Sequence, residues 1–260
     1  MTTKKYPAEE ETKGKIKELF AYRRLTDLLG LSNMSKDLKF TNQLIDVQYQ
    51  IYMLDGYLES QWDIHKKDLK AYWDAINESL HHMGYKKKQI ASLVTEIKEY
   101  QQIEWDCRKD IWPTSVSFKT FYTTKSCDVR LIRHLIYKAH QDLENLWKEK
   151  AWWYYDMITE IHDDIEDLEE DIRTYNGNRF LISILRKGAE KTRHDYEQYL
   201  RNITEKAREY FESKMQKGKN KQLAAWTESR SKETIRLLHD KLNSKAMDQL
   251  SAALLLVHMN

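Results

Sequence analysis

Glycine and proline are so scarce in this chain that few architectures other than helical ones remain open to it. The 260 residues include 7 Gly and 2 Pro. These residues form the tight turns between strands, so a chain poor in both makes few such turns. An all-β fold and a doubly wound α/β sheet are therefore disfavoured, and we expect long helices.

The charge and the cysteine content narrow the class of protein. A formal net charge of +2 is too small to bind nucleic acid through a general excess of basic residues. Cys107 and Cys127 are too few for a disulfide framework and suit a reducing compartment. The longest apolar stretch, SAALLLVHM, is shorter than the ~20 residues of a membrane span. We expect a cytoplasmic protein with no transmembrane segment and no nucleic-acid partner.

Apolar periodicity predicts an all-α fold, a single-domain bundle of about eight to ten helices. No linker rich in Pro, Ser or Gly interrupts the chain, so we expect a flexible tail over residues 1–12 and one helical domain over 13–260. Gly30 and Gly84 are expected to end the first and third helices. The expected helices cover about residues 12–29, 35–58, 63–83, 86–110, 118–122, 127–140, 142–175, 179–187, 189–215 and 223 onward.

The segment ITEIHDDIEDLEED, residues 158–171, carries the strongest indication of chemistry. Asp163, Asp167 and Asp171 recur every fourth residue and form a column about 12 Å long on one helix face. Like charges at this spacing destabilise a helix, so the column needs a counterion. Mg²⁺ suits it, because this ion takes oxygen ligands from one or two carboxylates and from substrate phosphates. The alternative is an acidic face exposed to solvent.

This segment resembles the second aspartate-rich motif of class I isoprenoid synthases. Residues 163–167, DDIED, are similar to that motif, and with Asp171 they fit the spacing of the terpene cyclase motif (N,D)Dxx(S,T)xxxE. Asn178 follows at the interval expected of terpene cyclases. The same stretch with Arg173 is also similar to the DxxED…GRxY stretch of squalene and phytoene synthases, with one residue too many.

Two upstream segments extend the resemblance. Asp55 and Glu59, one helical turn apart, resemble a degenerate first motif of the form DDxxD or DxxxD. Residues 112–118, WPTSVSF, resemble the P(S,T)xxx(Y,F) segment of microbial terpene cyclases, which precedes an Arg that senses diphosphate. That Arg is absent here, and Lys125 or Arg130 is expected to replace it.

The resemblance implies Mg²⁺-dependent ionisation of a prenyl diphosphate (C10 to C20) by a terpene synthase, with Mn²⁺ as a substitute metal and a homodimer allowed. A chain-elongating or head-to-head coupling synthase is the alternative in the same superfamily. The implied metal ligands are Asp55, Glu59, Asp163, Asp164, Asp167 and Asp171, of which Asp55, Asp163, Asp167 and Asp171 are also implied to be catalytic. The implied diphosphate ligands are Lys125, Arg130, Arg173 and Asn178. Aromatic side chains that would line the cavity and stabilise a carbocation are Tyr49, Tyr52, Phe118, Phe121, Trp152 and Tyr155.

Two other classes of protein stay open. A carboxylate-bridged diiron protein needs two Glu-x-x-His pairs on separate helices. The chain has one, Glu78 with His81, and a looser site would recruit His134, His140 and His162. The second class is a helical interaction protein whose acidic column faces solvent or a basic partner.

Overall fold

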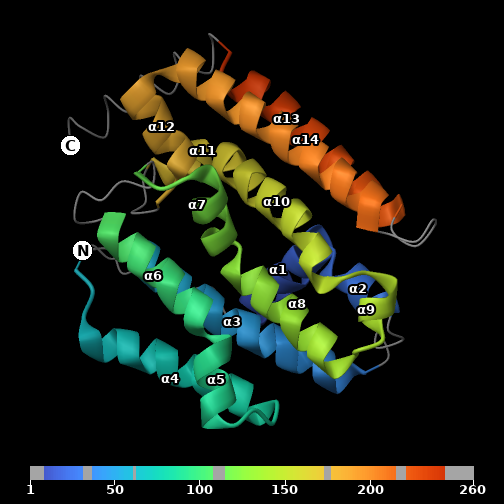
Figure 1. The fold of residues 1–260 in the computed structure, drawn as a ribbon. Coiled ribbons are helices and arrows are strands. Elements are labelled where there is room, and N and C mark those ends of the chain that lie inside the picture. Colours follow the sequence, from blue (N-terminus) through green and yellow to red (C-terminus); the bar gives the residue numbers. More distant parts are fainter. Residues whose placement is uncertain are drawn as a thin grey trace. The chain divides into compact units, whose positions relative to one another are not determined.

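The computed structural model describes residues 9–31, 37–60, 63–107, 115–172, 177–214 and 221–243. Every regular element in these ranges is a helix, which confirms the all-α fold class (Figure 1). The helices pack into two compact units. Unit 1 comprises Met1–Thr95 and Asp128–Leu143, and unit 2 comprises Glu96–Cys127 and Glu144–Asn260.

Unit 1 is organised around its longest helix, α3 (Leu38–Ser60), which packs against α1 (Glu9–Tyr22) and α4 (Lys66–His82). Its other helices are α2 (Leu25–Leu31), α5 (Lys87–Leu93) and nearly all of α8 (Cys127–Ala139). Buried residues recur along α3 every three or four positions, as one buried stripe of a helix requires: Leu44, Val47, Ile51, Leu54 and Leu58.

Unit 2 is organised around α10 (Trp152–Glu166), which packs against α7 (Phe118–Lys125), α12 (Arg179–Lys187), α13 (Ala189–Lys214) and α14 (Lys221–Lys241). Figure 1 shows α13 and α14 lying side by side. The remaining elements are α6 (Thr95–Cys107), α9 (Leu143–Leu146), the 3₁₀ helix η3 (Glu149–Ala151) and α11 (Leu168–Asp171). Helices α7, α10, α11, α12, α13 and α14 meet in a core that includes Phe121, Ile158, Ile161, Leu168, Phe180, Tyr196, Leu200 and Leu238.

Several expected helices are divided in the structure. The first, expected over residues 12–29, is split by Arg24, whose backbone adopts a left-handed conformation with φ of 60°. The helix expected over 86–110 is interrupted at Val94, between α5 and α6. The longest one, expected over 142–175, consists of α9, η3, α10 and α11. Apolar periodicity continues through these breaks, so the pattern alone does not reveal them.

Two helices are followed by a glycine with a positive φ angle. Gly84, with φ of 90°, follows α4 as the sequence predicts, and Gly188, with φ of 80°, follows α12. Both positions adopt the left-handed conformation that glycine reaches without the steric cost of a Cβ atom. Gly30, which was expected to end the first helix, lies instead inside α2.

The chain passes between the two units at positions that no linker marks. The crossings fall after Thr95, after Cys127 and after Leu143, and each lies within a helix or at its first residue. A prediction based on the absence of a Pro, Ser or Gly linker cannot detect such crossings. One domain over 13–260 therefore stays a prediction beside the observed division into units.

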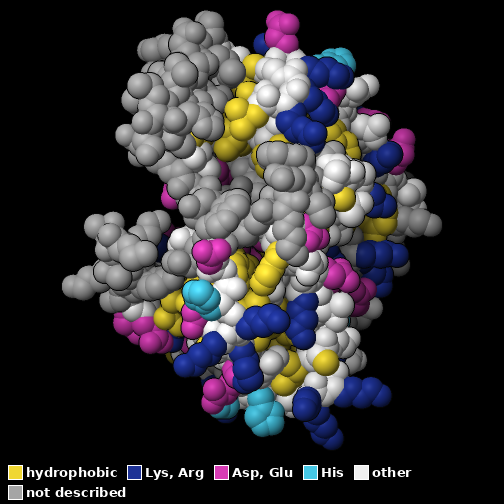
Figure 2. Space-filling view, turned by 90° about the vertical axis from the view of Figure 1, so that its left-hand side faces the viewer, with side chains coloured by type: hydrophobic (Ala, Val, Ile, Leu, Met, Phe, Trp, Pro, Cys, Tyr) yellow, Lys and Arg dark blue, Asp and Glu magenta, His cyan; other side chains and the backbone are white. Residues whose placement is uncertain are grey.

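The surface mixes both signs of charge. On the face drawn in Figure 2, basic and acidic side chains are interspersed with hydrophobic ones. No helix in the described ranges combines the length and the apolar character needed to cross a membrane.

Candidate functional site

The acidic column spans the junction of α10 and α11. Asp167 ends α10 and precedes α11, with φ of −84° and ψ of 6°. The backbone N–H of Asp167 donates to the carbonyl of Asp163 over 2.9 Å, and that of Asp171 donates to the carbonyl of Asp167 over 2.9 Å. These successive bonds keep the three residues one turn apart on one face, as their spacing predicts.

The column concentrates negative charge at a surface that is partly closed to water. Asp171 is 7% exposed, Asp163 is half-buried and Asp167 is exposed. Desolvation raises the pKa of Asp167 to about 6, and the charges of Asp163 and Asp171 add to this effect. The positive charge of Lys125 opposes it. The other two carboxylates of the column therefore disfavour the charged form of Asp167.

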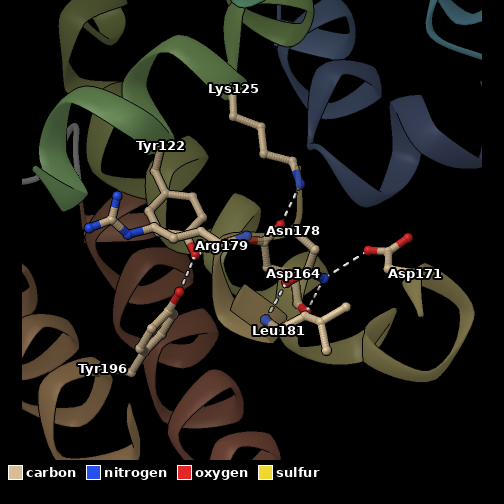
Figure 3. A network of polar contacts seen from close by, with 8 residues as sticks. All are labelled: Tyr122, Lys125, Asp164, Asp171, Asn178, Arg179, Leu181 and Tyr196. Atoms are coloured by element: carbon tan, nitrogen blue, oxygen red, sulfur yellow. Dashed lines mark hydrogen bonds and ion pairs between the residues drawn. The ribbon is translucent and has the colours of Figure 1, made fainter. Parts of the chain in front are cut away.

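Asp164, next to the column, is held by three donors from two other parts of the chain (Figure 3). Its Oδ1 atom forms an ion pair and hydrogen bond with the ammonium of Lys125 on α7. Its Oδ2 atom accepts from the Tyr122 hydroxyl over 2.8 Å and from the backbone N–H of Arg179 over 3.0 Å. Asp164 is 1% exposed, so both oxygens are engaged inside the protein.

The charge of Lys125 is set by its acidic surroundings. Burial disfavours the ammonium form, but the charges of Asp164, Glu160 and Asp171 and the hydrogen bond to Asp164 outweigh it and raise the pKa of Lys125 well above its ordinary value. The side chain of Lys125 is 14% exposed and that of Asp164 is 0% exposed. Lys125 is therefore a permanent cation beside the acidic column.

Asn178 ties the column to α12. Its side-chain Nδ2 donates to the Asp164 carbonyl over 2.7 Å and to Asp171 Oδ2 over 2.7 Å. Its Oδ1 accepts from the backbone N–H of Leu181 over 2.8 Å, which caps the first turn of α12. Asn178 is fully buried, so the whole amide serves to fix the position of Asp171 against α10.

The sequence did not single out three residues of this network, namely Tyr122, Tyr196 and Arg179. The hydroxyls of Tyr122 and Tyr196 are 2.8 Å apart, and burial followed by the charge of Asp164 raises the pKa of both phenols. The Arg179 guanidinium lies 4.5 Å from the Phe118 ring centroid. Tyr122 precedes Lys125 by three residues, a spacing that places both on one face of a helix. This spacing is the feature of the sequence from which Tyr122 could have been predicted. Nothing comparable points to Tyr196.

The upstream candidates lie in unit 1. Asp55 and Glu59 are half-buried and one turn apart on α3, and Arg130 is half-buried on α8. Tyr49 and Tyr52 also lie on α3, where Tyr52 is 41% exposed. The two acidic motifs thus belong to different units, whereas Lys125, Asn178 and Asp163–Asp171 all belong to unit 2. Arg173 lies outside the described residues.

The aromatic candidates of unit 2 are packed against other side chains. Phe121 belongs to the core around α10, and Phe118 stacks on Tyr199 with ring centroids 4.6 Å apart. Trp152 and Tyr155 are each 1% exposed. Trp152 contacts the rings of Trp147 and Trp226 at centroid distances of 5.4 and 6.2 Å. These four residues therefore contribute to the core of the unit.

The donor chemistry of the column is compatible with Mg²⁺. In the part of the chain that the structure describes, no three His, Cys, Asp or Glu side chains form a ready group for a metal ion. Mg²⁺ does not need such a group, because one or two carboxylates together with substrate phosphates commonly hold it. Asp163 and Asp167 supply oxygen donors, while Asp171 already uses its Oδ2 atom on Asn178.

The residues considered for a diiron site are dispersed. His81 and Glu78 lie on α4, where both residues are exposed, and the His81 Nδ1 atom is 3.2 Å from the Tyr85 carbonyl oxygen. His134 and His140 lie in unit 1 as well. His162 lies in unit 2, where its Nδ1 atom is 3.1 Å from the Thr234 hydroxyl.

Searches of family models, of curated proteins and of solved structures found no match for this chain.

Proposed function

We propose that this chain is a class I isoprenoid synthase-like enzyme that binds a prenyl diphosphate with Mg²⁺ at the α10–α11 junction and ionises it. One observation carries the proposal. Two segments to which the resemblance assigns diphosphate-binding residues converge on the acidic column, with Lys125 bonded to Asp164 and Asn178 bonded to Asp171. These residues are separated by 39 and 7 positions, and a solvated acidic helix face does not require either contact.

The column supplies the acidic half of such a site. Asp163 and Asp167 would hold the divalent ion, and the Asn178 amide fixes the Asp171 carboxylate beside them. Bound there, the ion would supply electrostatic stabilisation of the departing diphosphate. The Lys125 ammonium adds a fixed positive charge at the same place, and its four-carbon stem lets it follow the leaving group.

The buried side of the network keeps this arrangement rigid. Asp164 holds the end of α7 through Tyr122 and Lys125, and it holds the start of α12 through the Arg179 N–H. Hydrogen-bonded support of this kind maintains the geometry of residues that contact a metal or a substrate.

The activity is tested by incubating the purified chain with C10, C15 and C20 prenyl diphosphates, with Mg²⁺ or with EDTA, and analysing organic extracts by gas chromatography and mass spectrometry. A Mg²⁺-dependent hydrocarbon or alcohol is expected. Its skeleton distinguishes a terpene synthase from a coupling enzyme, and an elongated diphosphate identifies a chain-elongating synthase.

A matched pair of variants links the activity to the column. Asp167→Asn removes one charge from the column and should abolish Mg²⁺-dependent turnover, whereas Glu170→Gln removes one charge from an exposed neighbouring position and should leave it intact. Equal activity in both variants would remove the site assignment. If no substrate gives a product, the helical interaction protein is favoured, or the diiron protein if iron copurifies.

We also propose that the protein resides in a reducing compartment such as the cytoplasm, on the basis of its two cysteines.

A further inference from the structure

The positive charge of Lys125 acts beyond its partner Asp164, on Asp167 and Asp171 of the acidic column. Asp164, Glu160 and Asp171 all favour its charged form. In return, Lys125 favours the ionised form of Asp167. The fold therefore supplies the column with a cation from within the chain, which α7 holds against Asp164 near the C-terminal end of α10 (Figure 3).

A divalent cation at this column meets that ammonium group. Two positive charges that share one group of carboxylates repel each other, even at the effective dielectric constant of a protein surface. The ammonium also occupies Oδ1 of Asp164, a residue to which the resemblance assigns metal binding. The two cations are thus alternatives for the same negative charge.

Lys125 is able to leave without a change in the backbone. It is the last residue of α7, and its side chain keeps 14% of its surface in solvent. The other two donors to Asp164, the Tyr122 hydroxyl and the Arg179 N–H, both act on Oδ2 and would remain in place. Departure of the ammonium would therefore uncover Oδ1 alone.

We propose that Lys125 is the resident counter-ion of the acidic column, and that a divalent cation binds there by displacing its ammonium from Asp164. This inference rests on the proposed function only in taking the column as a divalent-cation site. The ammonium that leaves Asp164 becomes available to an anionic ligand. The protein alone should therefore bind the metal weakly, and removal of the Lys125 charge should strengthen metal binding.

The test measures Mn²⁺ binding by electron paramagnetic resonance, with no diphosphate present. Lys125→Gln removes the charge and keeps an amide donor for Asp164, and Lys119→Gln removes a charge from an exposed position of the same helix. We expect Lys125→Gln to bind Mn²⁺ about tenfold more tightly than the wild-type chain and Lys119→Gln. The double variant Lys125→Gln/Asp164→Asn, whose net charge equals that of the wild type, should lose this gain. Affinity in Lys125→Gln no greater than in Lys119→Gln would overturn the proposal.

A second measurement uses the wild-type chain and does not depend on how a variant folds. The Lys125 ammonium, buried in an ion pair, should give a slowly exchanging nitrogen-15 resonance. Titration with Mg²⁺ should abolish that protection in parallel with metal binding. A resonance that stays protected at saturating Mg²⁺ would show that the ion pair survives and would overturn the displacement.

Failure of this inference is distinguishable from failure of the proposed function. Tighter Mn²⁺ binding by Lys125→Gln, with no product from any prenyl diphosphate, would support the counter-ion and remove the synthase. A Mg²⁺-dependent product from a wild-type chain whose Lys125 resonance stays protected would support the synthase and remove the displacement.

Discussion

The ammonium of Lys125 and the carboxylate of Asp164 form an ion pair that joins the last residue of α7 to the third-last residue of α10, 39 positions further along the chain. The Asp164 side chain in this pair has no exposed surface. Removal of one partner therefore leaves a buried charge without its main compensation, which is costly.

Loss of this ion pair should lower the stability of the folded chain. Lys125→Met should lower the free energy of unfolding by about 3 kcal/mol, because the Asp164 carboxylate stays buried. Lys119→Met should change it by no more than about 0.5 kcal/mol, because Lys119 is exposed. Urea denaturation followed by circular dichroism checks both values. Equal losses in the two variants would show that the pair contributes no more than a surface lysine does.

Asn178 should prove as important to stability as the ion pair. Asn178→Ala removes two donated hydrogen bonds and the cap of α12, so we expect a loss of about 2 to 3 kcal/mol. Asn178→Asp keeps the capping oxygen but places a negative charge against Asp171, so it should not restore stability at neutral pH. Thermal unfolding at pH 7 measures both variants. A stable Asp variant would show that capping outweighs the contact with Asp171.

Asp167 makes stability depend on pH in the direction opposite to that of most carboxylates. Its pKa in the folded chain is raised to about 6 from an ordinary value of 3.8, so folding favours its protonated form. The stability that this group contributes is fully present below the unfolded-state pKa, and it is lost as pH rises through about 6. The exposed position of Asp167 allows solvent to screen the effect.

The Asp167→Asn variant tests this linkage. It should match the wild type in stability at pH 3 and exceed it above pH 7, by less than about 1 kcal/mol because the site is exposed. Urea unfolding at both pH values provides the measurement. Added Mg²⁺ should also lower the pKa of Asp167 in the wild type, as observed by the carbon-13 shift of its carboxyl group. A variant less stable than the wild type at pH 8 would contradict the assigned direction.

The Tyr122 and Tyr196 hydroxyls should act as one unit. Tyr122→Phe removes a donor to Asp164 and a partner of Tyr196, and we expect a loss of about 1 to 3 kcal/mol. Tyr196→Phe should cost less, because Tyr122 keeps its bond to Asp164. The double variant should lose less than the sum of the two, and a double-mutant cycle in urea measures the coupling. Strict additivity would show that the two hydroxyls act independently.

Replacing glycine by alanine should have opposite effects on stability at two positions, because the backbone conformation of the two glycines differs. Gly188→Ala should destabilise the chain by about 1 to 2 kcal/mol, because φ of 80° is unfavourable for alanine although no atom crowds the new Cβ. Gly56→Ala, inside α3 with open space around the Cβ position, should stabilise it by about 0.5 to 1 kcal/mol. Thermal unfolding distinguishes the two signs, and stabilisation by both substitutions would contradict the strain at Gly188.

The sequence predicted those parts of the site that depend on local helical geometry. The column of Asp163, Asp167 and Asp171 follows from a spacing of four residues, and backbone hydrogen bonds maintain it across the α10–α11 junction. The all-α class followed with equal directness from the scarcity of glycine and proline. Both inferences need only the period of a helix and the chemistry of turns.

The contacts between helices could not be predicted in the same way. Lys125 was a candidate for diphosphate binding, but its bond to Asp164 depends on which face of α7 packs against α10. The tertiary contacts of Tyr196 depend likewise on the packing of α13 against α12 and α14. The left-handed backbone conformation at Arg24 could not be predicted either, because it occurs at a residue other than glycine. The resemblance assigned Asn178 to diphosphate binding. Only the structure shows that this buried side chain forms hydrogen bonds with α10, α11 and α12.

The interleaving of the two units along the chain constrains the order in which they are completed during synthesis. The segment Asp128–Leu143 of unit 1 leaves the ribosome only after Glu96–Cys127 of unit 2. Unit 1 therefore cannot finish packing until Glu96–Cys127 of unit 2 has been synthesised, and an early fragment ending near Thr95 lacks α8. Domains that occupy continuous segments fold one after another as they emerge. Here unit 1 is completed only when Leu143 has been synthesised, with the first segment of unit 2 already made and Glu144–Asn260 still to come.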